Sequence, residues 1–348
     1  MALSTMAVFG SAFFTPIVVG KMADTIGWEW SFYLVAIFAG ALLPLLFFFC
    51  PETAFVRDNT LDTDITGRVI RTDNPALSTP LQPLNVDEKH NTTIANTSVS
   101  SSSSLPPQAP PKPYLSTLSP FNGRKSPENF LQLLLRPFPL FGHPAILWAC
   151  LTQGTLIGWT VLIGIVLAAI FLAPPLFFTA TDCGYMYTSA FIGALAGFLL
   201  CGLLSDYSAK ALMRRNNGVY EPEFRILLVI PQLLFGCGGL YAFGITAGDI
   251  VKYHWLAPCI AFAFVTAGMV CGAVASSLYL VDAHRDVAIE AFTCLMIFKN
   301  VFSFALTFRG YEWLVQGGPR KIFLAVGSVQ VGICCLSVAM CKLRDKCC

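Results

Sequence analysis

Residues 145–172 read AILWACLTQGTLIGWTVLIGIVLAAIFL, an unbroken stretch without Asp, Glu, Lys, Arg or His. The hydrocarbon core of a bilayer is about 30 Å thick, and an α-helix needs about 20 apolar residues to cross it. Glycines such as Gly154 are costly in soluble helices, but membrane helices tolerate them. The stretch therefore predicts a transmembrane helix.

Seven more stretches of this kind flank it on both sides. The whole chain is 55% hydrophobic and 12% charged, with a mean hydropathy of +0.65, whereas soluble domains are about 45–50% apolar and about 25% charged. We predict an all-α polytopic membrane protein with about eight transmembrane helices, embedded in a lipid bilayer. The predicted spans are residues 2–20, 31–50, 145–172, 185–204, 226–247, 255–281, 291–308 and 322–341.

A long polar region separates the second span from the third. It contains SVSSSSS at 98–104 and LPPQAPPKP at 105–113, which is the composition of a disordered linker. Near its end, NFLQLLLRPF at 129–138 is amphipathic enough to lie on a membrane surface. We expect three parts: residues 1–52 with two spans, 53–143 as the linker, and 144–348 with six spans and a short tail.

The Lys and Arg residues of the short loops favour one orientation. Most of them lie on the side of the linker and the C-terminus, which predicts that both are cytoplasmic, although the loop between the last two spans is basic too. Asn91 and Asn96 begin glycosylation motifs, whose use would invert this orientation. We expect the plasma membrane rather than the vacuole.

Composition and motif searches exclude several classes of protein. The formal net charge is +2 and no basic stripe is present, so nucleic acid is not an expected partner. Most of the 13 cysteines lie inside apolar stretches, where they behave as small hydrophobic residues. We find no metal-spaced His/Cys set, phosphate-binding loop or Ser/His/Asp constellation, so we expect neither an enzyme nor a metal or cofactor.

Lys299 is the sharpest candidate for a functional residue. An ammonium in the middle third of a span costs several kcal/mol unless it faces a cavity or a partner. We therefore predict that Lys299 and its neighbour Asn300 line a substrate cavity. A structural Lys299 bonded to backbone carbonyls or to a helix C-terminus is an equally good interpretation.

Two other groups of polar residues are candidates. Gln153 and Trp159 have the spacing to share part of a helix face and could contact a ligand, although hydrogen bonding between helices explains them as well. Asp206 follows a span, and its carboxylate could accept hydrogen bonds from Arg214 or Arg215. An ordinary helix-capping aspartate is the alternative.

Four local motifs resemble the major facilitator superfamily, and within it the fungal transporters of the drug:proton antiporter type that handle polyamines and multiple drugs. In the first motif, Thr15 and Val19 stand where the family pattern has glycines. The motifs are TPIVVG (15–20) with GWEWSF (27–32) and PETAFVR (51–57); GLLSD (202–206) with RRNNGVYEPEFR (214–225); PAILWA (144–149) with PP (174–175); and YLVDAHRD (279–286) with FKN (298–300).

The resemblance implies twelve helices in two bundles of six, so that the chain as given would lack the first four. It implies a monomeric secondary transporter that moves a small organic solute or cation by alternating access, coupled to protons. It also implies that Asp206, Arg214 and Arg215 form a gate latch. The alternative is a truncated membrane protein that does not transport, acting as a sensor or partner, or a gene-model fragment.

Overall fold

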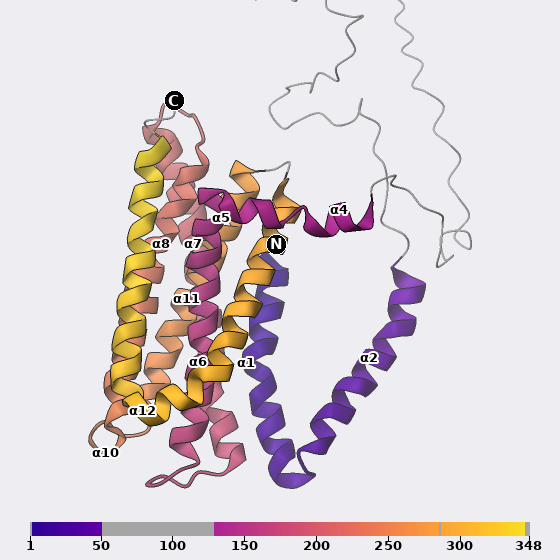
Figure 1. Cartoon of the computed structure of the whole chain (residues 1–348), viewed down its shortest axis with the longest axis vertical. Coiled ribbons are helices and arrows are strands. Elements are labelled where there is room, and N and C mark those ends of the chain that lie inside the picture. The colour runs from indigo at the N-terminus through magenta and orange to yellow at the C-terminus, as the bar shows by residue number, and fades with distance from the viewer. Residues whose placement is uncertain (1, 51–128, 285–286, 345–348) are drawn as a thin grey trace, which may run out of the picture. The chain divides into compact units, whose positions relative to one another are not determined.

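The computed structural model describes residues 2–50, 129–284 and 287–344, and all regular elements in these ranges are helices (Figure 1). Contacts divide the chain into two compact units, residues 1–36 with 126–348 and residues 37–125. The first unit contains almost all of the described structure. The helices and helical turns are α1 (Ala2–Thr25), α2 (Glu29–Phe49), α4 (Phe130–Leu135), η2 (Phe138–Gly142), α5 (Pro144–Ala149), η3 (Cys150–Gly154), α6 (Thr155–Phe171), α7 (Ala180–Arg215), η4 (Pro222–Leu228), α8 (Val229–Pro231), η5 (Gln232–Cys237), α9 (Gly238–Gly248), α10 (Ile250–Tyr253), α11 (Leu256–Ala283) and α12 (Ala288–Arg344).

Six of the described helical segments are long and apolar enough to cross a membrane, which confirms an all-α polytopic membrane protein. The last of them lies in α12, which turns at Gly318, where φ is +69° and Pro319 follows. That turn separates the predicted spans 291–308 and 322–341. α1, whose residues include Ser11, Thr15 and Lys21, is a helix as predicted but is not among the six.

Several predicted elements are only partly matched. α2 matches the predicted span 31–50 and is apolar enough to cross a membrane. The amphipathic stretch at 129–138 forms only the short helix α4, because Pro137 interrupts it before η2 begins at Phe138. The linker motifs and both glycosylation motifs lie outside the described residues.

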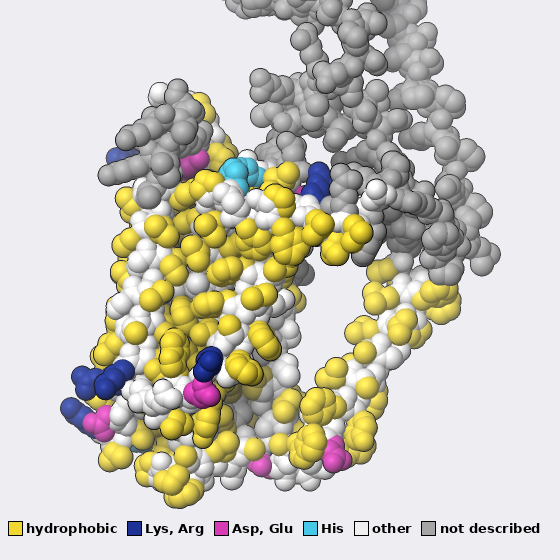
Figure 2. Space-filling view, in the orientation of Figure 1, with side chains coloured by type: hydrophobic (Ala, Val, Ile, Leu, Met, Phe, Trp, Pro, Cys, Tyr) yellow, Lys and Arg dark blue, Asp and Glu magenta, His cyan; other side chains and the backbone are white. Residues whose placement is uncertain are grey.

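α11 lies at the centre of the first unit and packs against α7 and α9. Small residues allow this close approach, because a Cβ on Gly193 or Gly197 of α7 would lie within 2.6 Å of a carbonyl oxygen of α11. Glycine contacts of this kind are how membrane helices associate without a hydrophobic driving force. Figure 2 shows apolar side chains along the flank, with charged ones gathered near the two ends.

We call these two ends of the bundle the linker end and the far end. The linker end carries α4, η2, the last residues of α7 and α11, and the start of α12 (Figure 1). The far end carries the last turn of α1, the first turn of α7, α10 and the turn at Gly318.

Candidate functional site

The chain reverses sharply after α7, and this turn positions the first candidate site. Asn217 and Gly218 are both left-handed, with φ of 51° and 84°, a conformation that Asn and Gly tolerate best. The Asn216 side-chain amide donates to the carbonyl oxygen of Val219 and to Glu221. The turn sends the chain back toward the bundle, so that Tyr220, just before η4, and Arg225 of η4 face α7 and α11.

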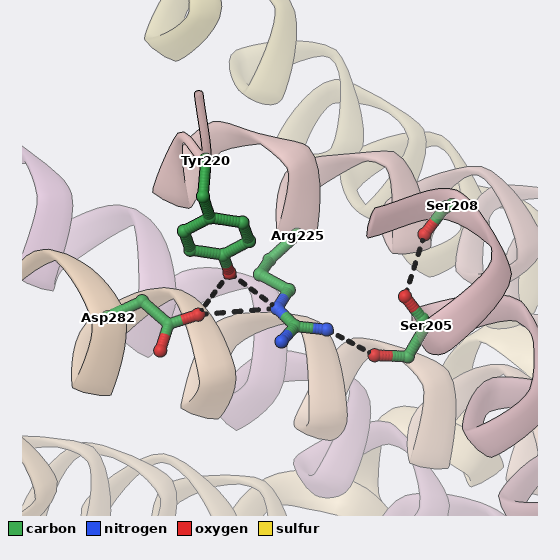
Figure 3. Close-up of polar contacts among 5 residues, drawn as sticks. All are labelled: Ser205, Ser208, Tyr220, Arg225 and Asp282. Atoms are coloured by element: carbon green, nitrogen blue, oxygen red, sulfur yellow. Dashed lines mark hydrogen bonds and ion pairs between the residues drawn. The ribbon is translucent and has the colours of Figure 1, made fainter. Parts of the chain in front are cut away.

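Four side chains from these elements form what we call the linker-end network: Ser205, Tyr220, Arg225 and Asp282 (Figure 3). Arg225 Nε lies 3.3 Å from Asp282 Oδ2 and donates to the Tyr220 hydroxyl at 2.9 Å. Tyr220 in turn donates to Asp282 Oδ2, and Arg225 Nη1 donates to Ser205 Oγ. The network therefore ties α7, η4 and α11 together through one guanidinium group.

The network is shielded from solvent but not fully buried. The side chains of Arg225 and Asp282 are 18% and 20% exposed. Burial, together with the hydrogen bond to Asp282, raises the pKa of the Tyr220 phenol, so that it stays protonated and remains a donor. Charge-assisted hydrogen bonds in such surroundings are stronger than neutral ones. The arrangement can hold three helical elements together.

The predicted latch residues lie near this network but are not part of it. Asp206, Arg214 and Arg215 are exposed, and no hydrogen bond or ion pair joins Asp206 to either arginine within the described part of the chain. Consecutive residues of a helix point about 100° apart, so Ser205 contacts Arg225 whereas Asp206 does not. The expected Asp206–arginine contact is therefore replaced by a contact between Arg225 and Asp282.

A second group of polar residues, which we call the polar layer, lies inside the bundle. Two of the helical segments that carry these residues, η3 and η5, are π-helical. This conformation is found mostly as short bulges, which often mark functional sites. Gln232 Nε2 donates to the main-chain oxygen of Thr152 at 2.9 Å, and Ser276 Oγ donates to Gln153 Oε1 at 3.0 Å. The members are Thr152, Gln153, Thr155, Trp159, Gln232, Ser276 and Gln330.

Two predicted substrate contacts belong to this layer. Trp159 is 5% exposed; its Nε1 donates to Gln330 Oε1 at 3.0 Å, and its ring packs edge-on against Phe302. Gln153 is half-buried and accepts its hydrogen bond from α11. Both side chains thus connect helices, which is the alternative interpretation that their sequence pattern allowed.

Lys299 lies near the middle of the first half of α12. It is half-buried, its neighbour Asn300 is exposed, and its side chain has no hydrogen-bond or ion-pair partner among the described residues. A Cβ on Gly154 of η3 would lie 3.6 Å from the Lys299 Cα, so the two backbones are close there. The backbone-bonded alternative finds no support, because no carbonyl oxygen in the described ranges accepts from Lys299.

The linker end carries two further contacts between its helical segments. Arg136 Nε lies 3.2 Å from Glu290 Oε1, which joins the last part of the linker to α12. The rings of His143 and His284 meet edge-on at 4.8 Å between centroids. Burial and the neighbouring His143 lower the pKa of His284, which favours its neutral form.

Some of these residues could have been found from the sequence and others could not. Tyr220, Arg225 and Asp282 all lie inside motifs quoted above, but the motifs do not say which charged residues meet. Gln232 and Gln330 are isolated amides within apolar spans, which is a visible signal of buried hydrogen bonding. The π-helical form of η3 and η5 has no comparable signature in this sequence.

Comparisons with known proteins agree with the motifs. The model of the Major Facilitator Superfamily matches residues 1–305. Similar proteins include Protein HOL1 of Saccharomyces cerevisiae, 29% identical over 48% of this chain and 28% of its own length. An uncharacterized MFS-type transporter of Schizosaccharomyces pombe and the MFS transporter cpaT of Aspergillus oryzae are each 25% identical, over 90% of this chain and 56% of their own lengths.

The chain thus spans at most 56% of the length of these relatives. No solved structure matches it. The family match covers most of the chain, from α1 into the first half of α12, and includes all four residues of the linker-end network. The chain therefore belongs to the major facilitator superfamily, whose members are membrane transporters and not enzymes.

Proposed function

We propose that this chain forms part of a secondary active transporter that moves a small organic solute or cation across the plasma membrane by alternating access, coupled to protons. Lys299 is the observation that carries the proposal. It is a half-buried ammonium near the middle of a span, and no described residue pairs with it. Because such a charge is costly inside a membrane, it is retained where it faces a water-filled path or a ligand.

In this proposal α1 and α2 close an N-terminal bundle, residues 144–348 form the C-terminal bundle, and the linker and C-terminus are cytoplasmic. Substrate binds between the bundles near Lys299 and Asn300. Gln153 and Trp159 pack behind these two residues and fix the shape of the binding surface. The linker-end network, with Asp206, Arg214 and Arg215 close by, forms the cytoplasmic gate. The transporter works as a monomer. The family match favours this function over a non-transporting sensor or a gene-model fragment.

The test replaces Lys299 in a fungal host that expresses the gene. A growth-based screen for uptake and resistance first identifies a solute and its dependence on the proton gradient. Lys299→Met should then lower transport about tenfold or more, because a hydrogen bond to a charged group contributes about 1.5–3 kcal/mol. Lys299→Arg keeps the charge and should retain part of the activity.

Two controls make the result decisive. Removing a charge from the middle of a span should not impair insertion, so Lys299→Met should accumulate in the membrane like the parent. Lys321→Met removes an exposed charge at the far end and should leave transport unchanged. Full transport by Lys299→Met would contradict the proposed role of Lys299.

A further inference from the structure

One backbone amide in the first turn of α7 donates its hydrogen bond to a side chain of a different helix. Thr179 and Asp182 form a capping box that satisfies the amides of both residues. The amide of Thr181, between them, donates to Asp24 Oδ2 at 2.6 Å. Asp24 lies in the last turn of α1, so a carboxylate of α1 completes the cap of α7. Helix N-termini leave such amides unpaired, and their dipole favours a negative charge.

Glycines press the same two helices together just beside this bond. Gly20 and Gly184 are both buried. A Cβ on Gly20 would lie 2.6 Å from the carbonyl oxygen of Ala180, and a Cβ on Gly184 would lie 2.7 Å from that of Pro16. Both separations are shorter than any side chain permits, so the backbones are in direct contact at the far end.

The other half of the α1–α7 seam is looser. A Cβ on Gly10 would meet the Phe191 ring at 3.6 Å, which is ordinary van der Waals contact. A small cavity of about 30 Å³ lies there, lined by side chains that include Phe9, Ala194 and Phe198. In the described residues, the polar contacts between α1 and α7 are all made by Asp24 and Gly20 at the far end. The seam is thus fastened at one end.

We propose that Asp24 is a gating residue: its carboxylate, bound to the Thr181 amide, holds the far end of the α1–α7 seam closed. Opening separates Asp24 from Thr181 and exposes the glycine contact behind it. The link to substrate movement rests on the proposed function, in which α1 and α7 belong to different bundles. The closure of the seam itself does not depend on transport.

The test measures how easily a reagent enters the seam. Thr181→Cys places a thiol at the half-buried position and keeps the backbone amide that Asp24 binds, but it removes the hydroxyl that lies 3.5 Å from the Gly20 oxygen. The Thr181→Cys chain is therefore the reference for every further substitution. The chain is purified in detergent, where both ends are accessible, and the rate of maleimide labelling is followed. The parent chain without this substitution gives the background from the native cysteines.

Adding Asp24→Ala should raise the labelling rate about three- to ten-fold, because a charge-assisted hydrogen bond is lost at an exposed site. Asp24→Asn keeps an acceptor without the charge and should give a smaller increase. Asp249→Asn, which removes an exposed far-end acid that makes no side-chain hydrogen bond in the described residues, should leave the rate unchanged.

A cysteine at Val251, 82% exposed, reports on general loosening and should react equally in all variants. An unchanged rate at position 181 in Asp24→Ala would overturn the gating role of Asp24, as would an equal rise in Asp249→Asn or at position 251. If the labelling rates change as expected but the protein transports nothing, the proposed function is overturned, whereas the closure of the seam by Asp24 still stands.

Discussion

The two ends of the bundle are held in different ways. At the linker end, one guanidinium joins three elements through Ser205, Tyr220 and Asp282, and the contacts of Arg136 with Glu290 and of His143 with His284 lie at the same end. At the far end, α1 meets α7 through bare backbone, a single carboxylate and the Thr181 hydroxyl. Side-chain charge dominates one end and glycine contact dominates the other, so substitutions should affect the two ends through different mechanisms.

The largest effect should come from Arg225. Arg225→Met removes the shared donor and leaves Asp282 without its positive partner, which costs about 3–5 kcal/mol for a fully buried pair. Because one fifth of each side chain is exposed, we expect a destabilisation of about 2–3 kcal/mol. The midpoint of thermal unfolding in detergent measures it. Arg215→Met, an exposed change nearby, should stay within about 0.5 kcal/mol. Equal midpoints for the two variants would contradict a structural role for the network.

A smaller effect should come from the glycine contact at the far end. Gly184→Ala inserts a methyl group where the Pro16 carbonyl oxygen already lies, and overpacking of this kind costs about 1–3 kcal/mol. Gly202→Ala in the same helix has open space around it and should be neutral or stabilising by up to about 1 kcal/mol. Unfolding midpoints of the two variants compare them directly. If Gly184→Ala were as stable as Gly202→Ala, the two backbones would not be in contact.

The smallest effect should be a dependence on pH at the linker end. Because burial and His143 lower the pKa of His284, the folded chain binds fewer protons at this site than the unfolded chain does. Its contribution to stability is therefore complete above about pH 6.5 and declines as the pH falls below that value. His284→Gln should flatten the unfolding midpoint against pH in this range. The exposed far-end variant His254→Gln should keep the slope of the parent, and a parent without any slope would contradict the prediction.

The sequence predicts the helices better than it predicts the contacts between them. Predicted spans 226–247 and 255–281 correspond to Pro222–Gly248 and Leu256–Ala283, because long apolar stretches have few other solutions. The partner of Asp282 could not be chosen among Arg214, Arg215 and Arg225, since the choice depends on the left-handed turn at Asn217 and Gly218. Three-dimensional packing also decides which of two adjacent residues, Ser205 or Asp206, faces inward.

The glycine pattern near α1 shows the same limit. Thr15 and Val19 replace glycines of the family motif, yet α1 still packs closely because Gly20 meets Gly184, a residue far away in the sequence. The sequence does not reveal the role of Asp24 either, because its partner is a backbone amide, which every residue except proline carries. Sequence motifs describe side chains, so a contact to the main chain cannot be recognised from them.

Because Asp24 of α1 completes the cap of α7, one amide hydrogen of α7 reports on whether the two helices are in contact. The Thr181 N–H is bonded only while α1 lies against α7, whereas the neighbouring Asp182 amide is bonded within its own capping box. Deuterium exchange at Thr181 should therefore follow the separation of the two helices, with Asp182 as an internal reference on the same turn. A single pair of adjacent amides could time the opening of the seam in the unmodified protein, without any attached label.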